Sequence, residues 1–213
     1  MRTIGVIIAI VIVMLIIGAI FGVTYVSAYN GLVKRQENVN QGRSRFAAAL
    51  NTCTQKMKAV WTMADQEGAL EKETYVAIAK ARAGYDEANK EVDAAQKPQG
   101  SVLDLTKAGA DLGRALVNVR VAFEAYPTLK TSEVYQKAMV AVEEGYNEIK
   151  TSLDDWISVC RDYNTYRRSF VTNFFANTFF GDKFPERIAY YEGGIKEPEQ
   201  MKIPAEDLNP KAR

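Results

Sequence analysis

Histidine is absent from this 213-residue chain. Its absence excludes Ser–His and Cys–His nucleophilic systems, HExxH zinc sites and the histidine-containing di-iron sites of helical bundles. A Gly-rich phosphate loop is also missing, because Gly109-x-x-x-Gly113 lacks the Gly-Lys-Ser/Thr ending. Carboxylates are the remaining metal ligands, but Glu144 and Glu148 flank the apolar stripe of their segment and are expected to be solvated. We therefore expect no catalytic residue, no metal, no cofactor and no enzymatic activity.

Cysteine is scarce, and a net excess of either charge is missing. Cys53 and Cys160 lie far apart and fit no metal-binding spacing. Each falls on an apolar stripe described below, so we interpret both as small buried residues in preference to a disulfide. The 27 Lys and Arg residues oppose 26 Asp and Glu residues. This balance gives no reason to expect the basic face that nucleic acid requires, so no nucleic-acid partner is expected.

Charge is absent from the run Ile4 to Val23 (IGVIIAIVIVMLIIGAIFGV). At about 1.5 Å per residue its twenty residues span roughly 30 Å, the hydrocarbon thickness of a bilayer. A cleaved signal peptide is the alternative, because Val26-Ser27-Ala28 could serve as a cleavage site. The run is longer than a usual signal core and its charged N-terminal flank is only Met1-Arg2, so we predict a retained transmembrane anchor over residues 1–28. Gly18-x-x-x-Gly22 weakly indicates that two anchors pair into a homo-oligomer.

Basic residues are unevenly placed around this run. Only Arg2 and the amino group precede it, whereas Lys34, Arg35, Arg43 and Arg45 follow it within about twenty residues. Cytoplasmic flanks of membrane helices carry the excess of Lys and Arg. The asymmetry modestly favours a single-pass membrane protein with its bulk on the cytoplasmic face.

Proline is absent before Pro98. Because proline breaks helix interiors, the prolines mark joints, and we expect turns at residues 97–100 and 126–131. A further break is expected near residues 65–68. Each segment between these joints carries an apolar stripe of helical period. The stripes comprise Leu32, Val39, Phe46, Leu50, Cys53, Met57, Val60 and Ala64; Leu70, Thr74, Ile78, Ala81, Tyr85, Ala88, Val92 and Ala95; Leu105, Gly109, Leu112, Leu116, Val119, Phe123 and Tyr126; and Val134, Ala138, Ala141, Gly145, Ile149, Leu153, Trp156, Cys160, Tyr163 and Arg167.

These stripes predict an all-α fold. Amphipathic helices bury their stripes against one another, and short joints make consecutive helices antiparallel neighbours. We expect the transmembrane helix to continue into an antiparallel up-down-up-down four-helix bundle over residues 29–170, with long first and last helices. A Phe-rich membrane-proximal segment follows at residues 171–191. The polar, Pro-rich residues 192–213 are expected to be disordered.

Four blocks of the sequence are similar to the LemA family. They are YNGLVKRQENV (29–39), LEKETYVAIAKARAGYDEA (70–88), FEAYPTLKTSEVYQKA (123–138) and RDYNTYRRSFVTNFFANTFFG (161–181). The resemblance implies an antiparallel helical bundle on one N-terminal anchor, with a short outside N-terminus and the bulk inside. It implies no particular biochemical activity. The chain departs from the family at NTCTQKMKAVW, which lacks the usual proline, and at Val171, where proline is common, so it resembles a divergent member.

The Phe-rich segment VTNFFANTFFG (171–181) is the candidate site. In the expected topology the fourth helix returns to the bilayer, so basic and tyrosine side chains would lie at the interface and phenylalanines at the acyl boundary. The alternative is that the phenylalanines, Phe170 included, fold back and plug the open end of the bundle, and the two roles are compatible. The predicted membrane or partner contact comprises Arg161, Tyr163, Tyr166, Arg167, Arg168, Phe174, Phe175, Phe179 and Phe180.

The function predicted from these features is that of a membrane-anchored scaffold or interaction protein. Its partners would be the lipid bilayer and a protein that the sequence does not name. Two alternatives stay open: an assembly component of a phage or cell envelope, and a small-ligand binder or enzyme with an unrecognised pocket.

Overall fold

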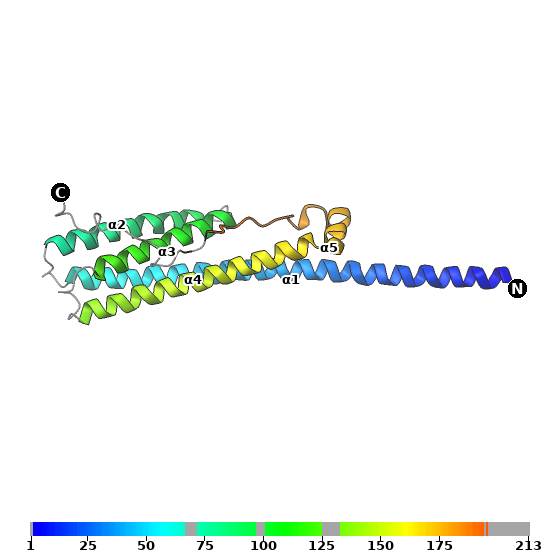
Figure 1. Ribbon diagram of the computed structural model, residues 1–213, viewed down its shortest axis with the longest axis horizontal. Coiled ribbons are helices and arrows are strands. Elements are labelled where there is room, and N and C mark those ends of the chain that lie inside the picture. Colours follow the sequence, from blue (N-terminus) through cyan, green and yellow to red (C-terminus); the bar gives the residue numbers. More distant parts are fainter. Residues whose placement is uncertain (1, 67–71, 97–100, 125–132, 194, 196–213) are drawn as a thin grey trace. The chain divides into compact units, whose positions relative to one another are not determined.

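The computed structural model describes residues 2–66, 72–96, 101–124, 133–193 and 195. Every regular element within these ranges is a helix, which confirms the expected all-α class for the described part of the chain. The predicted joints at 97–100 and 126–131 lie outside it. The elements are α1 (Arg2–Gln66), α2 (Lys72–Ala95), α3 (Val102–Glu124), α4 (Glu133–Arg168), α5 (Phe170–Phe175), the π-helical turn η2 (Ala176–Phe180) and the 3-10 turn η3 (Gly181–Lys183) (Figure 1).

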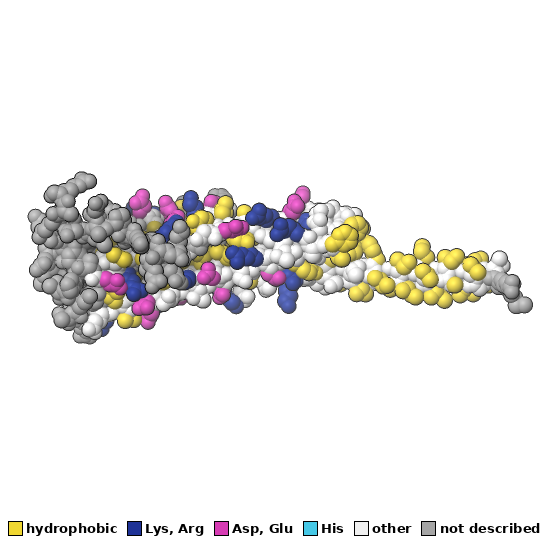
Figure 2. Space-filling model, viewed as in Figure 1, with side chains coloured by type: hydrophobic (Ala, Val, Ile, Leu, Met, Phe, Trp, Pro, Cys, Tyr) yellow, Lys and Arg dark blue, Asp and Glu magenta, His cyan; other side chains and the backbone are white. Residues whose placement is uncertain are grey.

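Helix α1 is unbroken over 65 residues. It contains no proline, and an interior glycine costs a helix only about 1 kcal/mol relative to alanine. An 18-residue window within it has a mean hydropathy of 3.3, and none of that window is buried. The helix is therefore long and apolar enough to cross a membrane, a property that it shares with signal sequences. Figure 2 shows the hydrophobic side chains that cover its N-terminal part.

The chain divides into two compact units. Residues 1–41 and 159–188 form the first, which we call the aromatic unit. Residues 42–158 and 189–213 form the second, which we call the helical body. Helices α1 and α4 each contribute to both units.

The core of the helical body consists of the predicted stripes. The α1 stripe is buried from Phe46 to Val60, and Trp156 of α4 is fully buried against Phe46, with 5.5 Å between the ring centroids. Gly109 of α3 lies so close to Phe46 that a methyl group there would overlap the ring. The α2 and α3 helices lie side by side (Figure 1). The described stripe residues within the helical body are therefore buried or half-buried, whereas the stripe residues Leu32, Val39, Cys160, Tyr163 and Arg167 belong to the aromatic unit.

Polar contacts at the edges of the body agree with the sequence pattern. The Ser101 hydroxyl accepts a hydrogen bond from the Asp104 backbone N–H at 3.0 Å and donates one to the Asp104 carboxylate at 2.7 Å, which caps the N-terminus of α3. Lys56 lies 3.0 Å from Glu144 and 3.7 Å from Glu148. These two carboxylates lie on a partly solvated charged face that joins α1 to α4.

The start of the C-terminal segment packs on the body. The Tyr191 backbone N–H donates to the Thr106 hydroxyl at 2.9 Å, and Ile195 is buried over Gly113, where a side chain would collide with it. Ile195 falls within the range 192–213 that was expected to be disordered, and it is buried on the helical body. Residues 196–213 lie outside the described part of the chain.

Both cysteines are free and fully buried, as the stripes indicate. Burial raises the pKa of each thiol from 9.0 to about 12. The unfolded chain releases these protons near pH 9 and the folded chain near pH 12, so the unfolded state binds fewer protons between these values. We expect the contribution of the two thiols to the free energy of unfolding to be constant below about pH 9 and to fall as the pH rises towards about 12. Denaturant titrations across this range measure the fall, and a Cys53→Ala variant should show a shallower slope.

Candidate functional site: an aromatic hairpin on α1

Three aromatic residues form a ladder on one face of α1. Phe21, Tyr25 and Tyr29 are four residues apart, a spacing that aligns side chains along a helix. Their rings meet the segment 170–184, which we call the aromatic hairpin (Figure 1). All these contacts are edge-to-face, the geometry that the ring quadrupole favours. The distances between ring centroids are 5.1 Å for Phe21–Phe175, 5.3 Å for Tyr25–Phe180, 5.4 Å for Tyr29–Phe180 and 5.5 Å for Tyr29–Phe184.

The local backbone sets the path of the hairpin. Helix α4 ends at Arg168, and Ser169 takes an extended conformation (φ −61°, ψ 144°) before α5 begins. At the far end of the hairpin Gly181 has φ 58° and ψ −145°, a region that side chains with a Cβ avoid. Gly181 therefore permits the turn that returns the chain towards Phe184.

A buried arginine holds the two sides of the hairpin together. The Arg167 side chain is only 3% exposed. Its guanidinium donates to the Asn173 amide oxygen at 2.9 Å, to the Asn177 amide oxygen at 2.7 Å and to the Phe184 carbonyl at 3.4 Å. Because guanidinium presents its donors in a rigid planar fork, one side chain joins α5, η2 and the segment at Phe184 that follows η3. We call these four residues the arginine clasp.

Two further α4 side chains fix the chain that leaves the hairpin. The Tyr163 hydroxyl donates to the Pro185 carbonyl at 2.8 Å, and burial raises the pKa of Tyr163 to about 12. The Asn164 amide group donates to the Ile188 carbonyl at 2.9 Å and accepts from the Ile188 N–H at 2.8 Å. A side-chain amide thus satisfies both backbone groups of one residue, as a neighbouring strand would.

Helices α1 and α4 meet above the ladder through Tyr166. Its hydroxyl donates to the Ser27 carbonyl at 3.2 Å, and its ring crosses Gly31, where any Cβ would overlap the phenol. The Arg35 guanidinium lies 3.9 Å from the centre of the Tyr166 ring, and its Nε lies 3.0 Å from the Asp162 carboxylate. A stacked cation and a glycine contact therefore determine how closely these helices approach.

The nine predicted contact residues do not form one surface. Buried positions are taken by Tyr163, Arg167, Phe175 and Phe180. Phe175 and Phe180 pack on the ladder, Arg167 forms the clasp and Tyr163 donates to the Pro185 carbonyl. The prediction that these four residues lie on the surface is therefore wrong, because each is buried by contacts within the aromatic unit. Tyr166 is half-buried. The residues that stay exposed are Arg161, Arg168, Phe174 and Phe179.

The aromatic hairpin therefore has two faces. Phe175, Phe180 and Phe184 pack inward on the ladder. Three other rings face outward: Phe174 and Phe179 are each 51% exposed, and Phe170 is 90% exposed. We call these three residues the outer face. Its most exposed member, Phe170, is missing from the contact residues predicted from the sequence, as are the ladder and the two asparagines of the clasp. The spacing of four that Phe21, Tyr25 and Tyr29 share, and Asn173 and Asn177 share, is the signal that could have revealed them.

Charge separates between the two units even though the whole chain is nearly neutral. The aromatic unit contains eight Lys and Arg residues and four Asp and Glu residues, a net charge of +4. The remaining 19 basic and 22 acidic residues give the helical body −3. The unit that carries the apolar helix is therefore the basic one.

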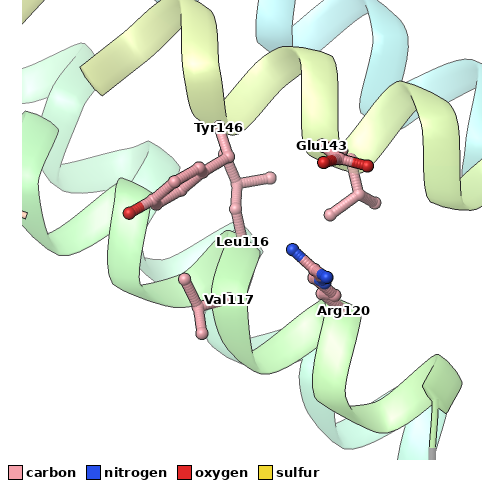
Figure 3. A pocket seen from close by; sticks show the side chains of 6 residues that line it. Leu116, Val117, Arg120, Glu143 and Tyr146 are labelled. Carbon is pink, nitrogen blue, oxygen red and sulfur yellow. The ribbon is translucent and has the colours of Figure 1, made fainter. Parts of the chain in front are cut away.

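A small hollow lies among the described residues of α3 and α4. It has room for about one water molecule and lies beside Leu116, Arg120 and Glu143 (Figure 3). Among the described residues, no group of three or more Cys, Asp or Glu side chains is placed to hold a metal ion. The aromatic hairpin is accordingly the candidate functional site.

Comparison with known proteins bears on the family. Neither a curated protein nor a solved structure matches the sequence significantly. The model of the LemA family matches residues 57–193, which is more than half of the chain and includes the whole aromatic hairpin. This chain therefore belongs to the LemA family.

Proposed function

We propose that this LemA-family chain is a single-pass membrane protein that acts as a non-enzymatic scaffold or interaction protein. The observation that carries the proposal is the unbroken α1, whose run Ile4 to Val23 is apolar and uncharged and contains an 18-residue window with no residue buried within the described part of the protein. Side chains such as Leu15 and Val23 are 68% and 70% exposed. Each such side chain gains roughly 1.5–3 kcal/mol when it is fully buried in an apolar medium, and a bilayer buries all of them together.

The contacts of α1 favour a retained anchor over a cleaved signal peptide. Cleavage after Ala28 would remove Phe21 and Tyr25, the ladder rings against which Phe175 and Phe179 pack. It would also remove Ser27, whose carbonyl accepts the Tyr166 hydrogen bond. The segment that would be lost is therefore part of the folded aromatic unit.

We further propose that the helical body is an antiparallel up-down-up-down bundle. Contacts between α1 and α4 pair Phe46 with Trp156 and Cys53 with Gly145. The residue number rises along α1 as it falls along α4, so these two helices run antiparallel. The α1–α2 contacts behave in the same way. The Thr54 hydroxyl donates a hydrogen bond to the Asn89 amide oxygen, and the Trp61 ring contacts the Tyr85 ring. This register supports the topology expected from the short joints.

Orientation and pairing of the anchor are also proposed. The bulk would lie on the cytoplasmic face, an orientation supported by the basic residues that follow the apolar run and the positive-inside rule. Two copies would pair through Gly18 and Gly22, around which a Cβ would meet no atom of the same chain within 4 Å. A protein partner would then bind the helical body.

The membrane proposal is tested by flotation. The full-length protein is mixed with vesicles, washed in high salt and centrifuged through a density gradient, and we expect it to float with the lipid. A variant without residues 4–23 should stay at the bottom, because the +4 charge alone does not hold in high salt. Full-length protein that fails to float, or a mature N-terminus found after Ala28 in cells, would show that α1 is not a retained anchor.

A further inference from the structure

We propose that the aromatic hairpin is a second membrane contact, whose outer face enters the acyl-chain boundary of the leaflet from which α1 emerges. The proposal rests on the membrane anchoring proposed above and adds a ligand, the bilayer lipid, to a site outside the anchor. Three observations carry it: the depth at which α1 holds the hairpin, the exposure of its rings, and the position of its cation.

The rise per residue along α1 gives the depth of each of its residues in the proposed bilayer. The continuous apolar run ends at Val23, where the polar Thr24 follows, so Phe21 lies two residues inside its end and Tyr25 two residues beyond it, each about 3 Å away along the axis. Phe179 contacts both rings, at 6.0 Å from Phe21 and 5.9 Å from Tyr25. The hairpin is thus held beside the point where the hydrocarbon layer must end if the run fills it.

The outer face adjoins these rings. The Phe174 ring lies 6.4 Å from the Phe179 ring and 5.4 Å from the Phe175 ring, and both of those rings contact Phe21. Phe170 lies four residues before Phe174, on the same side of α5. Figure 2 shows hydrophobic side chains on the hairpin next to those of the apolar helix. The exposed apolar surface of the anchor therefore continues onto the hairpin.

Polar groups follow immediately beyond this surface. Tyr29 lies six residues past Val23, or about 9 Å along the axis, within the headgroup layer. The Lys183 ammonium lies 4.7 Å from the centre of the Tyr29 ring and donates a hydrogen bond to its hydroxyl. A cation and a tyrosine thus lie at phosphate level, directly above the phenylalanines. This order of groups and the net charge of +4 favour a bilayer over a protein as the occupant.

The hairpin is already folded for this contact. The arginine clasp and Gly181 fix its backbone, and the inner rings are packed on the ladder. Insertion of the outer face therefore requires no change of conformation. The protein would be held in the membrane by two adjacent elements, α1 and the aromatic hairpin beside it.

The buried cysteines make a direct depth measurement possible. Because Cys53 and Cys160 are fully buried, a newly introduced surface cysteine can be labelled selectively with an environment-sensitive fluorophore. We would label Phe170→Cys and Phe174→Cys, with Leu15→Cys as the marker of the anchor and Thr151→Cys, an exposed position of α4, as the aqueous marker. The labelled full-length proteins are reconstituted into vesicles of phosphatidylcholine and phosphatidylglycerol that contain nitroxide lipids.

The proposal makes a distinct prediction for each position. Labels at 170 and 174 should shift to the blue and be quenched more strongly by a nitroxide near the headgroup end of the acyl chain than by one near the methyl end. The label at 15 should show the reverse preference, and the label at 151 should be quenched by iodide from the water alone. Labels at 170 and 174 that behave like 151, or that neither lipid nor iodide quenches because protein covers them, would overturn the second contact while a quenched label at 15 leaves the anchor intact. An unquenched label at 15 would overturn the anchor and with it the contact.

Discussion

Replacing Arg167 by Met is expected to open the aromatic hairpin. The change leaves the amide oxygens of Asn173 and Asn177 and the Phe184 carbonyl without their donor, and hydrogen bonds to charged groups contribute about 1.5–3 kcal/mol each. Partial rearrangement of these three groups will reduce the sum, so we expect the local free energy of opening to fall by about 2–4 kcal/mol. Native-state hydrogen exchange of residues 170–184 in detergent micelles measures it, as a loss of protection of roughly thirtyfold or more.

The adjacent arginine provides a matched control. Arg168 is exposed and donates one hydrogen bond, to the Asn164 carbonyl at 3.3 Å, so Arg168→Met should change the opening free energy by less than about 0.5 kcal/mol. Arg167→Lys keeps the charge but not the planar fork, and its effect should be intermediate. Equal protection in Arg167→Met and Arg168→Met would mean that the clasp does not hold the hairpin.

Replacing Trp156 by Ala is expected to have the largest effect on the helical body. The side chain is fully buried against Phe46, and its removal leaves a cavity that rigid helices fill only in part. Losses of this kind cost about 3–5 kcal/mol in the free energy of unfolding. Denaturant unfolding followed by helical circular dichroism, with the protein in micelles, measures the loss as a lower midpoint.

Val140 supplies the comparison on the same helix. It is 55% exposed on α4, and alanine is the better helix former, so Val140→Ala should leave stability within about 0.5 kcal/mol of the wild type. Should both variants lose the same stability, the cause would be a general sensitivity of α4 and not the Phe46–Trp156 core.

Much of this fold can be predicted from the sequence because its signals are local. A residue on a helix repeats its face every three to four positions, so the stripe from Leu32 to Val60 indicates burial without reference to a partner. The missing prolines and the uncharged run similarly indicate one long helix with an apolar end. The described stripe positions are buried or half-buried, Arg167 among them.

The candidate site was less predictable because its contacts join distant parts of the chain. The sequence places Arg167 on an inward stripe and also makes it a candidate for the surface, and nothing local decides between the two. The structure decides, because Asn173 and Asn177 supply the acceptors that let a guanidinium be buried. The phenylalanines are likewise not distinguished by the sequence, because composition alone does not tell which of them pack on α1 and which face outward.

The sequence by itself determined that this protein is helical, that its first helix has an apolar end of bilayer length, and that its aromatic residues concentrate near residue 175. Each of these follows from composition or period within one segment. Only the tertiary structure decided which rings pack on Phe21, Tyr25 and Tyr29 and which stay exposed, and that a neutral chain divides into a basic and an acidic unit. These outcomes depend on pairing residues such as Ser27 and Tyr166, 139 positions apart, and no local pattern encodes a partner at that distance.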